Sequence, residues 1–136
     1  MIPAAILALV RDSVPGVTVY DGRVPDGPGH DPPPDRYVAV YIDRGTRNAE
    51  AVDSVSSSRT WRWQVTCVAP DRAMAAWLAE RVADGLVDVR PKVDGWVCGQ
   101  IEHTFSQQPQ ADEQVQERPV VVAMDLYALL AEKLPA

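Results

Sequence analysis

A strict alternation of apolar and polar residues between positions 59 and 68 restricts the fold more than any other part of this sequence. Successive side chains of a β-strand point to opposite faces, so the segment separates into two sets. The apolar set is Trp61, Trp63, Val65 and Cys67, and the polar set is Arg62, Gln64 and Thr66. Two tryptophans on one face bury a large apolar area, so this face is expected to form part of the core or a subunit interface.

Two further segments have the apolar spacing of a helix. In the first, Pro3 suits the opening turn, and Pro15 ends the segment because proline lacks a backbone donor. Its apolar residues are Ile2, Ile6, Leu7, Leu9 and Val10. The second segment opens at Asp71, the expected N-cap, and Gly85 suits the position just after the end of the helix. Its apolar stripe consists of Met74, Trp77, Leu78 and Val82.

The remaining strands are indicated by β-branched and aromatic runs bounded by glycine and proline. They cover residues 17–20, 37–42, 95–105 and 119–130, with a short edge strand at 87–93 and a terminal helical turn at 129–134. Residues 37–42 are apolar on both faces, which predicts a central strand or one covered on both sides.

This order of elements predicts an α+β fold, with a single antiparallel or mixed β-sheet of about four to five strands and two α-helices packed on one face. A chain of 136 residues suits a single domain, residues 1–136. Three loops are expected within it: a flexible proline-rich loop at 25–35 and polar loops at 43–58 and 106–117.

The charge balance limits the classes of partner. Thirteen basic and nineteen acidic residues give a net charge of −6, which disfavours a general nucleic-acid binder with a basic face. The N-terminal apolar run lacks a basic n-region and is too short for a bilayer, so we expect neither a signal peptide nor a membrane span. We expect Cys67 and Cys98 to be buried, reduced thiols rather than a bridge between strands.

No catalytic, cofactor-binding or metal-binding constellation stands out in the sequence, and we do not expect an enzyme. His103 is adjacent to Glu102 in a strand, so the two side chains point to opposite faces. His30 lies in the proline-rich loop, which is too mobile to position a base. The two cysteines and two histidines are too far apart in sequence to indicate a zinc site.

Two features favour a surface function instead. Arg59 to Trp63 interleaves basic and aromatic residues, as single-strand nucleic-acid platforms do, but its tryptophans are better explained as core. Loop 43–58 is long and polar, and we interpret it as an arm that becomes ordered against a neighbouring subunit or another protein. The candidate interface residues are Arg44, Arg47, Glu50, Asp53, Arg59 and Arg62.

The order of these segments resembles a known family. The amino-terminal helix is followed by Val19-Tyr20-Asp21-Gly22-Arg23-Val24-Pro25, by Pro34-Asp35-Arg36-Tyr37-Val38, and by a strand and helix at 61–68 and 71–86. Val93-Asp94-Gly95, Asp112, Arg118 and the closing segment 120–127 complete the pattern. In order and spacing, nearly the whole chain resembles the tail terminator, tail completion or tail-to-head joining proteins of long-tailed bacteriophages.

The resemblance implies a small α+β subunit that forms a homo-oligomeric ring, commonly a hexamer. Such a ring caps the tail tube, stops its polymerisation and joins it to a head-completion or neck protein. The implied location is the tail or neck of the virion after assembly in the host cytoplasm, with no cofactor and no membrane. DNA would pass through the lumen without specific binding, which suits a negatively charged conduit.

Three alternatives remain open from the sequence: another neck or minor tail component, a small intracellular enzyme or ligand-binding domain, and a monomeric host-encoded adaptor. Compared with the family, the proline-rich insertion at 25–34 is a departure, and it could alter the outer edge of a ring.

Overall fold

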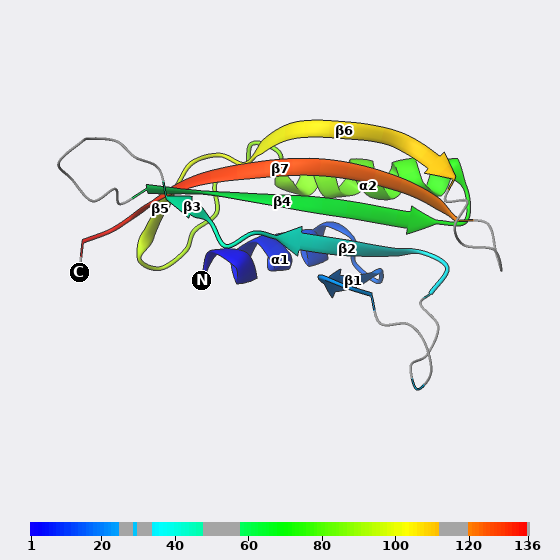
Figure 1. Cartoon of the computed structure of the whole chain (residues 1–136), viewed down its shortest axis with the longest axis horizontal. Coiled ribbons are helices and arrows are strands. Elements are labelled where there is room, and N and C mark those ends of the chain that lie inside the picture. The colour runs from blue at the N-terminus through cyan, green and yellow to red at the C-terminus, as the bar shows by residue number, and fades with distance from the viewer. Residues whose placement is uncertain (25–28, 30–33, 48–57, 112–119, 136) are drawn as a thin grey trace.

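The computed structural model describes residues 1–24, 29, 34–47, 58–111 and 120–135. These residues form two helices and one sheet of seven strands (Figure 1). The helices are α1 (Ile2–Ser13) and α2 (Arg72–Leu86). The strands are β1 (Thr18–Asp21), β2 (Tyr37–Ile42), β3 (Thr46–Arg47), β4 (Ser58–Ala69), β5 (Trp96–Cys98), β6 (Glu102–Ala111) and β7 (Val121–Lys133).

The sequence predicted an antiparallel or a mixed sheet, and the sheet is mixed. Its strand order is β1-β2-β4-β7-β5, with β3 paired to β4 and β6 paired to β7. Only the β1–β2 pair is parallel, and every other described pair is antiparallel. The α+β class is therefore confirmed, with more strands than the four to five expected because β3 and β5 are short additions.

Strand β2 has the predicted bounds and lies between β1 and β4. Its position in the sheet is central, as predicted. Val38 and Val40 are buried on the helix side; on the other face Ala39 is buried and Tyr41 is 45% exposed.

The segment predicted as one strand at 95–105 is divided in two. β5 and β6 follow one another along the same edge of β7, and the chain leaves that edge between them. Gly99 N still donates to Leu130 O, but Ile101 N donates to Val89 O and the Ile101 side chain is fully buried. Burial of this isoleucine between the two strands accounts for the break.

Three sequence predictions are wrong in this region. Residues 106–111 belong to β6 rather than to a loop, residues 129–133 belong to β7 rather than to a helical turn, and residues 87–93 form no strand beyond an isolated bridge from Val93 to Trp96. Polar residues form strand in β6 because the outer edge of a sheet tolerates exposed side chains. β7 continues because its last residues pair with both β4 and β5.

Both helices pack on the same face of the sheet, on the far side in the view of Figure 1. As predicted, the apolar face of β4 is buried beneath them. Asp71 is the N-cap of α2, with its carboxylate accepting from Met74 N at 2.8 Å. Gly85 lies inside α2 rather than after it. A Cβ at this position would lie 2.6 Å from the Cβ of Ser13 in α1. This glycine lets the two helices approach closely.

Candidate assembly surfaces

The face of the sheet away from the helices has no covering layer in the part of the chain that the structure describes. β7 alternates along its length, with every second residue buried beneath the helices and the others turned to this open face. The open-face residues of β7 are Val122, Met124, Leu126, Ala128 and Leu130. Tyr41 of β2 and Phe105 of β6 extend the apolar surface, and they are 45% and 50% exposed. Apolar side chains gathered on one face in this way are typical of a protein interface.

A β-bulge decides which side of the sheet each residue of β6 faces. His103 pairs with Tyr127 on the helix side, but Phe105 pairs with Leu126 on the open face. Without the shift at Thr104, both would lie on the same side, since strand residues two apart share a face. The bulge therefore places a phenylalanine in the open face and keeps the imidazole beneath the sheet.

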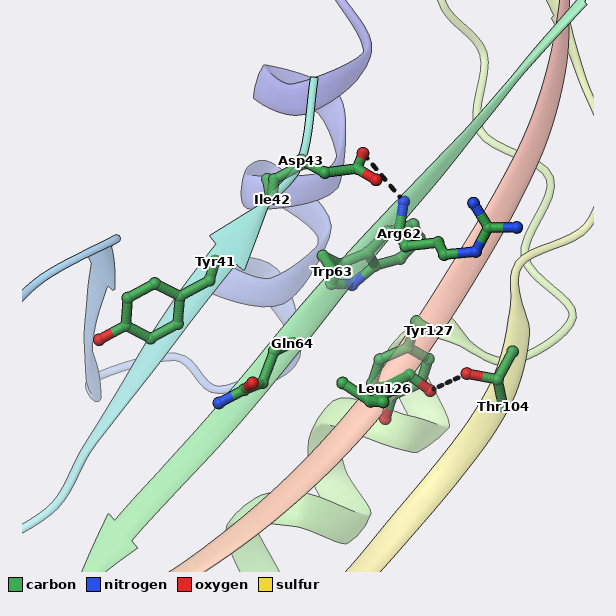
Figure 2. Close-up of a pocket in the computed structure, with 9 residues that line it drawn as sticks. All are labelled: Tyr41, Ile42, Asp43, Arg62, Trp63, Gln64, Thr104, Leu126 and Tyr127. Carbon is green, nitrogen blue, oxygen red and sulfur yellow. Dashed lines mark hydrogen bonds between the residues drawn. The ribbon is translucent and has the colours of Figure 1, made fainter. Parts of the chain in front are cut away.

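A hollow of about 380 Å³ lies in this open face (Figure 2). Its lining combines the aromatic ring of Tyr41 and the side chain of Leu126 with polar groups from Arg62, Gln64 and Thr104. Thr104 Oγ1 donates to Leu126 O at 3.2 Å, which ties β6 to β7 at the margin of the hollow. The guanidinium of Arg62 extends over β7 in Figure 2. The open hollow has an apolar and polar lining suited to side chains of a partner protein.

A second hollow, of about 460 Å³, is lined by Arg44, Gly45, Arg47 and Arg59. We call Arg44, Arg47 and Arg59 the arginine cluster. Arg47 of β3 lies directly opposite Arg59 of β4 in the antiparallel register. Two cations at opposed positions repel one another, so this arrangement favours binding of an anionic group between them.

The turn that presents the arginine cluster is held at two points. Asp43 Oδ1 accepts hydrogen bonds from Gly45 N at 2.9 Å and from Arg62 N at 3.1 Å. Gly45 has φ +81° and lies against the ring of Trp61, where an added Cβ would be 2.7 Å from a ring carbon. Only glycine fits a position with both this backbone angle and this contact. The arginine cluster is therefore built on a fixed turn.

The structure brings together some of the predicted interface residues and separates others. Arg44, Arg47 and Arg59 share one hollow. Arg62 pairs with Ala128 and points to the open face, opposite to Arg59. Glu50 and Asp53 lie outside the described residues.

The first part of loop 43–58 is not a projecting arm. Thr46 and Arg47 pair with Thr60 and Arg59 of β4, and Asp43 N donates to Arg62 O at 3.0 Å. The sequence-based interpretation fails here because these backbone groups find partners along the edge of β4 that β7 leaves open.

A polar group that the sequence analysis missed lies beneath the sheet. Asp125 of β7 is 4% exposed, and His103 Nε2 lies 2.9 Å from its Oδ1. His103 stacks on Tyr127, which stacks on Trp63, so three rings form a row across β6, β7 and β4. The sequence signal was an aspartate at a position where the alternation of β7 calls for an apolar residue.

The electrostatics of this polar group indicate a structural role. Burial, and then the negative charge of Asp125, raise the pKa of the Cys67 thiol to about 12. Burial also raises the pKa of Tyr127, with smaller effects from Asp125 and Cys67. Both groups are therefore protonated at neutral pH, and a protonated thiol is a poor nucleophile. Cys67 and Cys98 are both free and buried.

No group of three or more His, Cys, Asp or Glu side chains within the described residues is placed to hold a metal ion. None of the described helices has the length and apolar character required to cross a membrane.

No protein-family model matches the sequence, and no curated protein is significantly similar to it. Solved structures with the same fold do exist. One is a chain of the virion of a native gene transfer agent particle, with 19% identity and a TM-score of 0.63, covering 95% of this chain and 92% of that chain. Another, which bears no descriptive name, has 14% identity and a TM-score of 0.61, covering 99% and 96%. At these identities the likeness establishes a shared fold over nearly the whole chain.

Proposed function

We propose that this protein is a structural component of a phage-like virion particle, and specifically a tail terminator. In this role, copies form a ring, commonly a hexamer, that caps the tail tube and stops its polymerisation. The ring then joins the tube to a neck or head-completion protein, and DNA passes through its lumen. The fold shared with a chain of a gene transfer agent virion, over 95% of this chain, carries the proposal.

The open sheet face supports an assembly role. The sheet exposes tyrosine, phenylalanine and leucine side chains to water. Burying them against a partner lowers the free energy of the protein, because apolar surface is removed from water. We assign this face to the contact with a second copy, because ring formation buries the same face in every subunit. The arginine cluster adds charge to one end of the sheet, which suits a contact with defined orientation.

Native mass spectrometry of the purified chain tests the ring directly. We expect a closed oligomer of fixed stoichiometry, and we expect the purified ring to shorten tubes when it is added to polymerising tail tube protein. A strict monomer at high concentration would overturn the proposal, as would a ring that leaves tube length unchanged.

A substitution in the hollow tests whether the open face makes the contact. Leu126→Glu places a charge on this face and should abolish the ring while circular dichroism still reports a folded chain. Ala76→Glu, at an exposed position of α2, is the matched control and should assemble normally. Equal assembly of the two variants would show that copies meet through another surface.

A further inference from the structure

Basic side chains gather at the end of the sheet where β3 pairs with the start of β4 (Figure 1). Arg59 of β4 pairs with Arg47 on one side and with Ala131 of β7 on the other, so these three side chains share a face. Trp61, two residues along β4, shares this face and is buried on the helix side. The arginine cluster therefore lies on the helix side of the sheet, opposite to the open face.

No described carboxylate neutralises the arginine cluster. Within the part of the chain that the structure describes, none of its three guanidinium groups forms an ion pair. The nearest acid in the sequence, Asp43, uses its Oδ1 to accept hydrogen bonds from Gly45 N and Arg62 N. Two of the three arginine side chains are exposed and the third is partly exposed. The cluster therefore presents guanidinium donors that the described residues leave unused.

The end of β7 adds positive charge to the same face. Glu132 pairs with Ser58, one residue before Arg59, so it points to the opposite face from the arginine cluster. Lys133, two residues beyond Ala131, points to the face of the cluster and is exposed. This end of the helix-side face therefore carries three arginines and a lysine.

The guanidinium group determines the class of ligand that the cluster can bind. Its planar set of donors matches a carboxylate or a phosphate, which it binds through two parallel hydrogen bonds. Three such groups line one hollow of about 460 Å³. The turn that carries them is fixed by Asp43 and by the fit of Gly45 against Trp61, so little order has to be gained on binding.

The charge of the whole chain favours a short acidic segment of a protein over nucleic acid. A net charge of −6 repels a DNA duplex, which carries one negative charge per about 1.7 Å of its axis. Nucleic-acid binding also requires a basic surface that follows several phosphates, whereas the arginine cluster borders a single hollow. A segment that carries a few carboxylates matches both the size of this hollow and its charge.

We propose that the arginine cluster is a binding site for the carboxylates of a short acidic segment on another protein. Arg47 and Arg59 donate to these carboxylates from opposed positions, and Lys133 adds attraction at the margin. The cluster lies on the other side of the sheet from the open face, so it stays available when copies meet through that face. That the partner is a different protein rather than another copy rests on the proposed function.

A fluorescently labelled peptide of six glutamates, capped at both ends, tests the site by fluorescence anisotropy. We expect the purified chain to bind this peptide, and to bind it less tightly as salt rises. Arg47→Gln with Arg59→Gln should weaken binding by about tenfold or more, since hydrogen bonds between charged groups are lost. If this variant does not fold by circular dichroism, the single change Arg44→Gln at an exposed position takes its place.

Two matched variants separate guanidinium binding from general attraction. Arg47→Lys with Arg59→Lys keeps the charge but removes the paired donors, so it should lose most of the affinity that the glutamine variant loses. Arg11→Gln with Arg23→Gln makes the same change in net charge as the glutamine variant, at two exposed positions, and should bind normally. Equal weakening in the control and the cluster variants would mean that the cluster is no specific site.

Other outcomes would overturn the assignment of the partner. Tighter binding of a twelve-residue oligothymidylate through the same arginines would make the ligand a nucleic acid. Peptide binding that appears only after Glu50→Gln with Asp53→Asn would mean that the chain's own carboxylates occupy the cluster. Absence of peptide binding in every variant would leave the cluster without this function.

Native mass spectrometry distinguishes this inference from the proposed function. The glutamine variant should form the same ring as the unmodified chain, because its changes lie away from the open face. Loss of the ring in this variant would place the cluster between copies and overturn the choice of a different protein. A monomeric chain that binds the peptide through the cluster would overturn the ring and leave the acidic-segment site standing.

Discussion

The imidazole of His103 and the carboxylate of Asp125 lie 2.9 Å apart, across the pairing of β6 with β7. Asp125 is buried, whereas the His103 side chain is 29% exposed at the edge of the sheet. The contact thus anchors the outermost strand to a buried acid. It also gives that acid a hydrogen-bond partner, which a carboxylate at this depth requires.

Removing the imidazole should destabilise the fold. His103→Ala leaves Asp125 without this partner, and we expect a loss of about 1–3 kcal/mol in the free energy of unfolding, measured by urea denaturation. Glu102→Ala is the control, because Glu102 is the exposed neighbour on the other face. A similar loss in both variants would mean that the His103–Asp125 contact has no special weight.

Trp63 should be a structural residue rather than a nucleic-acid contact. It is 2% exposed and stacks on Tyr127 with ring centres 5.8 Å apart, so Trp63→Ala should cost about 3–5 kcal/mol. Trp77→Ala is the matched control, since Trp77 is 47% exposed on α2 and its loss should change stability little. Unchanged thermal stability of the Trp63 variant, together with lost nucleic-acid binding, would contradict this assignment.

Two features should make glycine necessary at position 45: its positive φ angle and its close contact with the Trp61 ring. Gly45 and Gly16 both have φ +81°, but only Gly45 has a neighbour, the Trp61 ring, within reach of a Cβ. Gly16→Ala should therefore cost only the backbone strain, about 1–2 kcal/mol. Gly45→Ala should cost a further 1–3 kcal/mol or so, because the ring must move. Equal melting temperatures for the two variants would show that the turn yields without strain.

The stability of the protein should fall at alkaline pH. An exposed cysteine has a pKa of 9.0, and burial in the fold raises the pKa of Cys67 to about 12. As the pH rises, the unfolded chain therefore loses this proton before the folded chain does. The contribution of the protonated Cys67 thiol to the free energy of unfolding is fully present below pH 9 and is lost progressively between pH 9 and 12. Cys67→Ala should reduce this pH dependence, which urea denaturation at pH 8 and pH 10.5 would measure. An identical slope in both proteins would remove Cys67 as the cause.

Local patterns in the sequence were enough to predict several elements of the fold. The alternation of residues 59–68 and the runs at 37–42 and 71–86 correspond to β4, β2 and α2. These predictions succeed because residues one, two or four positions apart determine which face a side chain occupies. The same alternation explains why Trp61 and Trp63 are both buried on the face of the sheet that the helices cover.

Only the tertiary structure decided how distant segments combine. The arginine cluster exists because β3 pairs with β4 and places Arg47 opposite Arg59. The His103–Asp125 contact exists because β6 pairs with β7 in one register, with a bulge that shifts Phe105 to the other face. Pairing partners and bulges depend on contacts between residues far apart in the chain, and a shift of one position reverses every side chain that follows. The sequence determined which faces each strand has, and the register determined which residues meet on them.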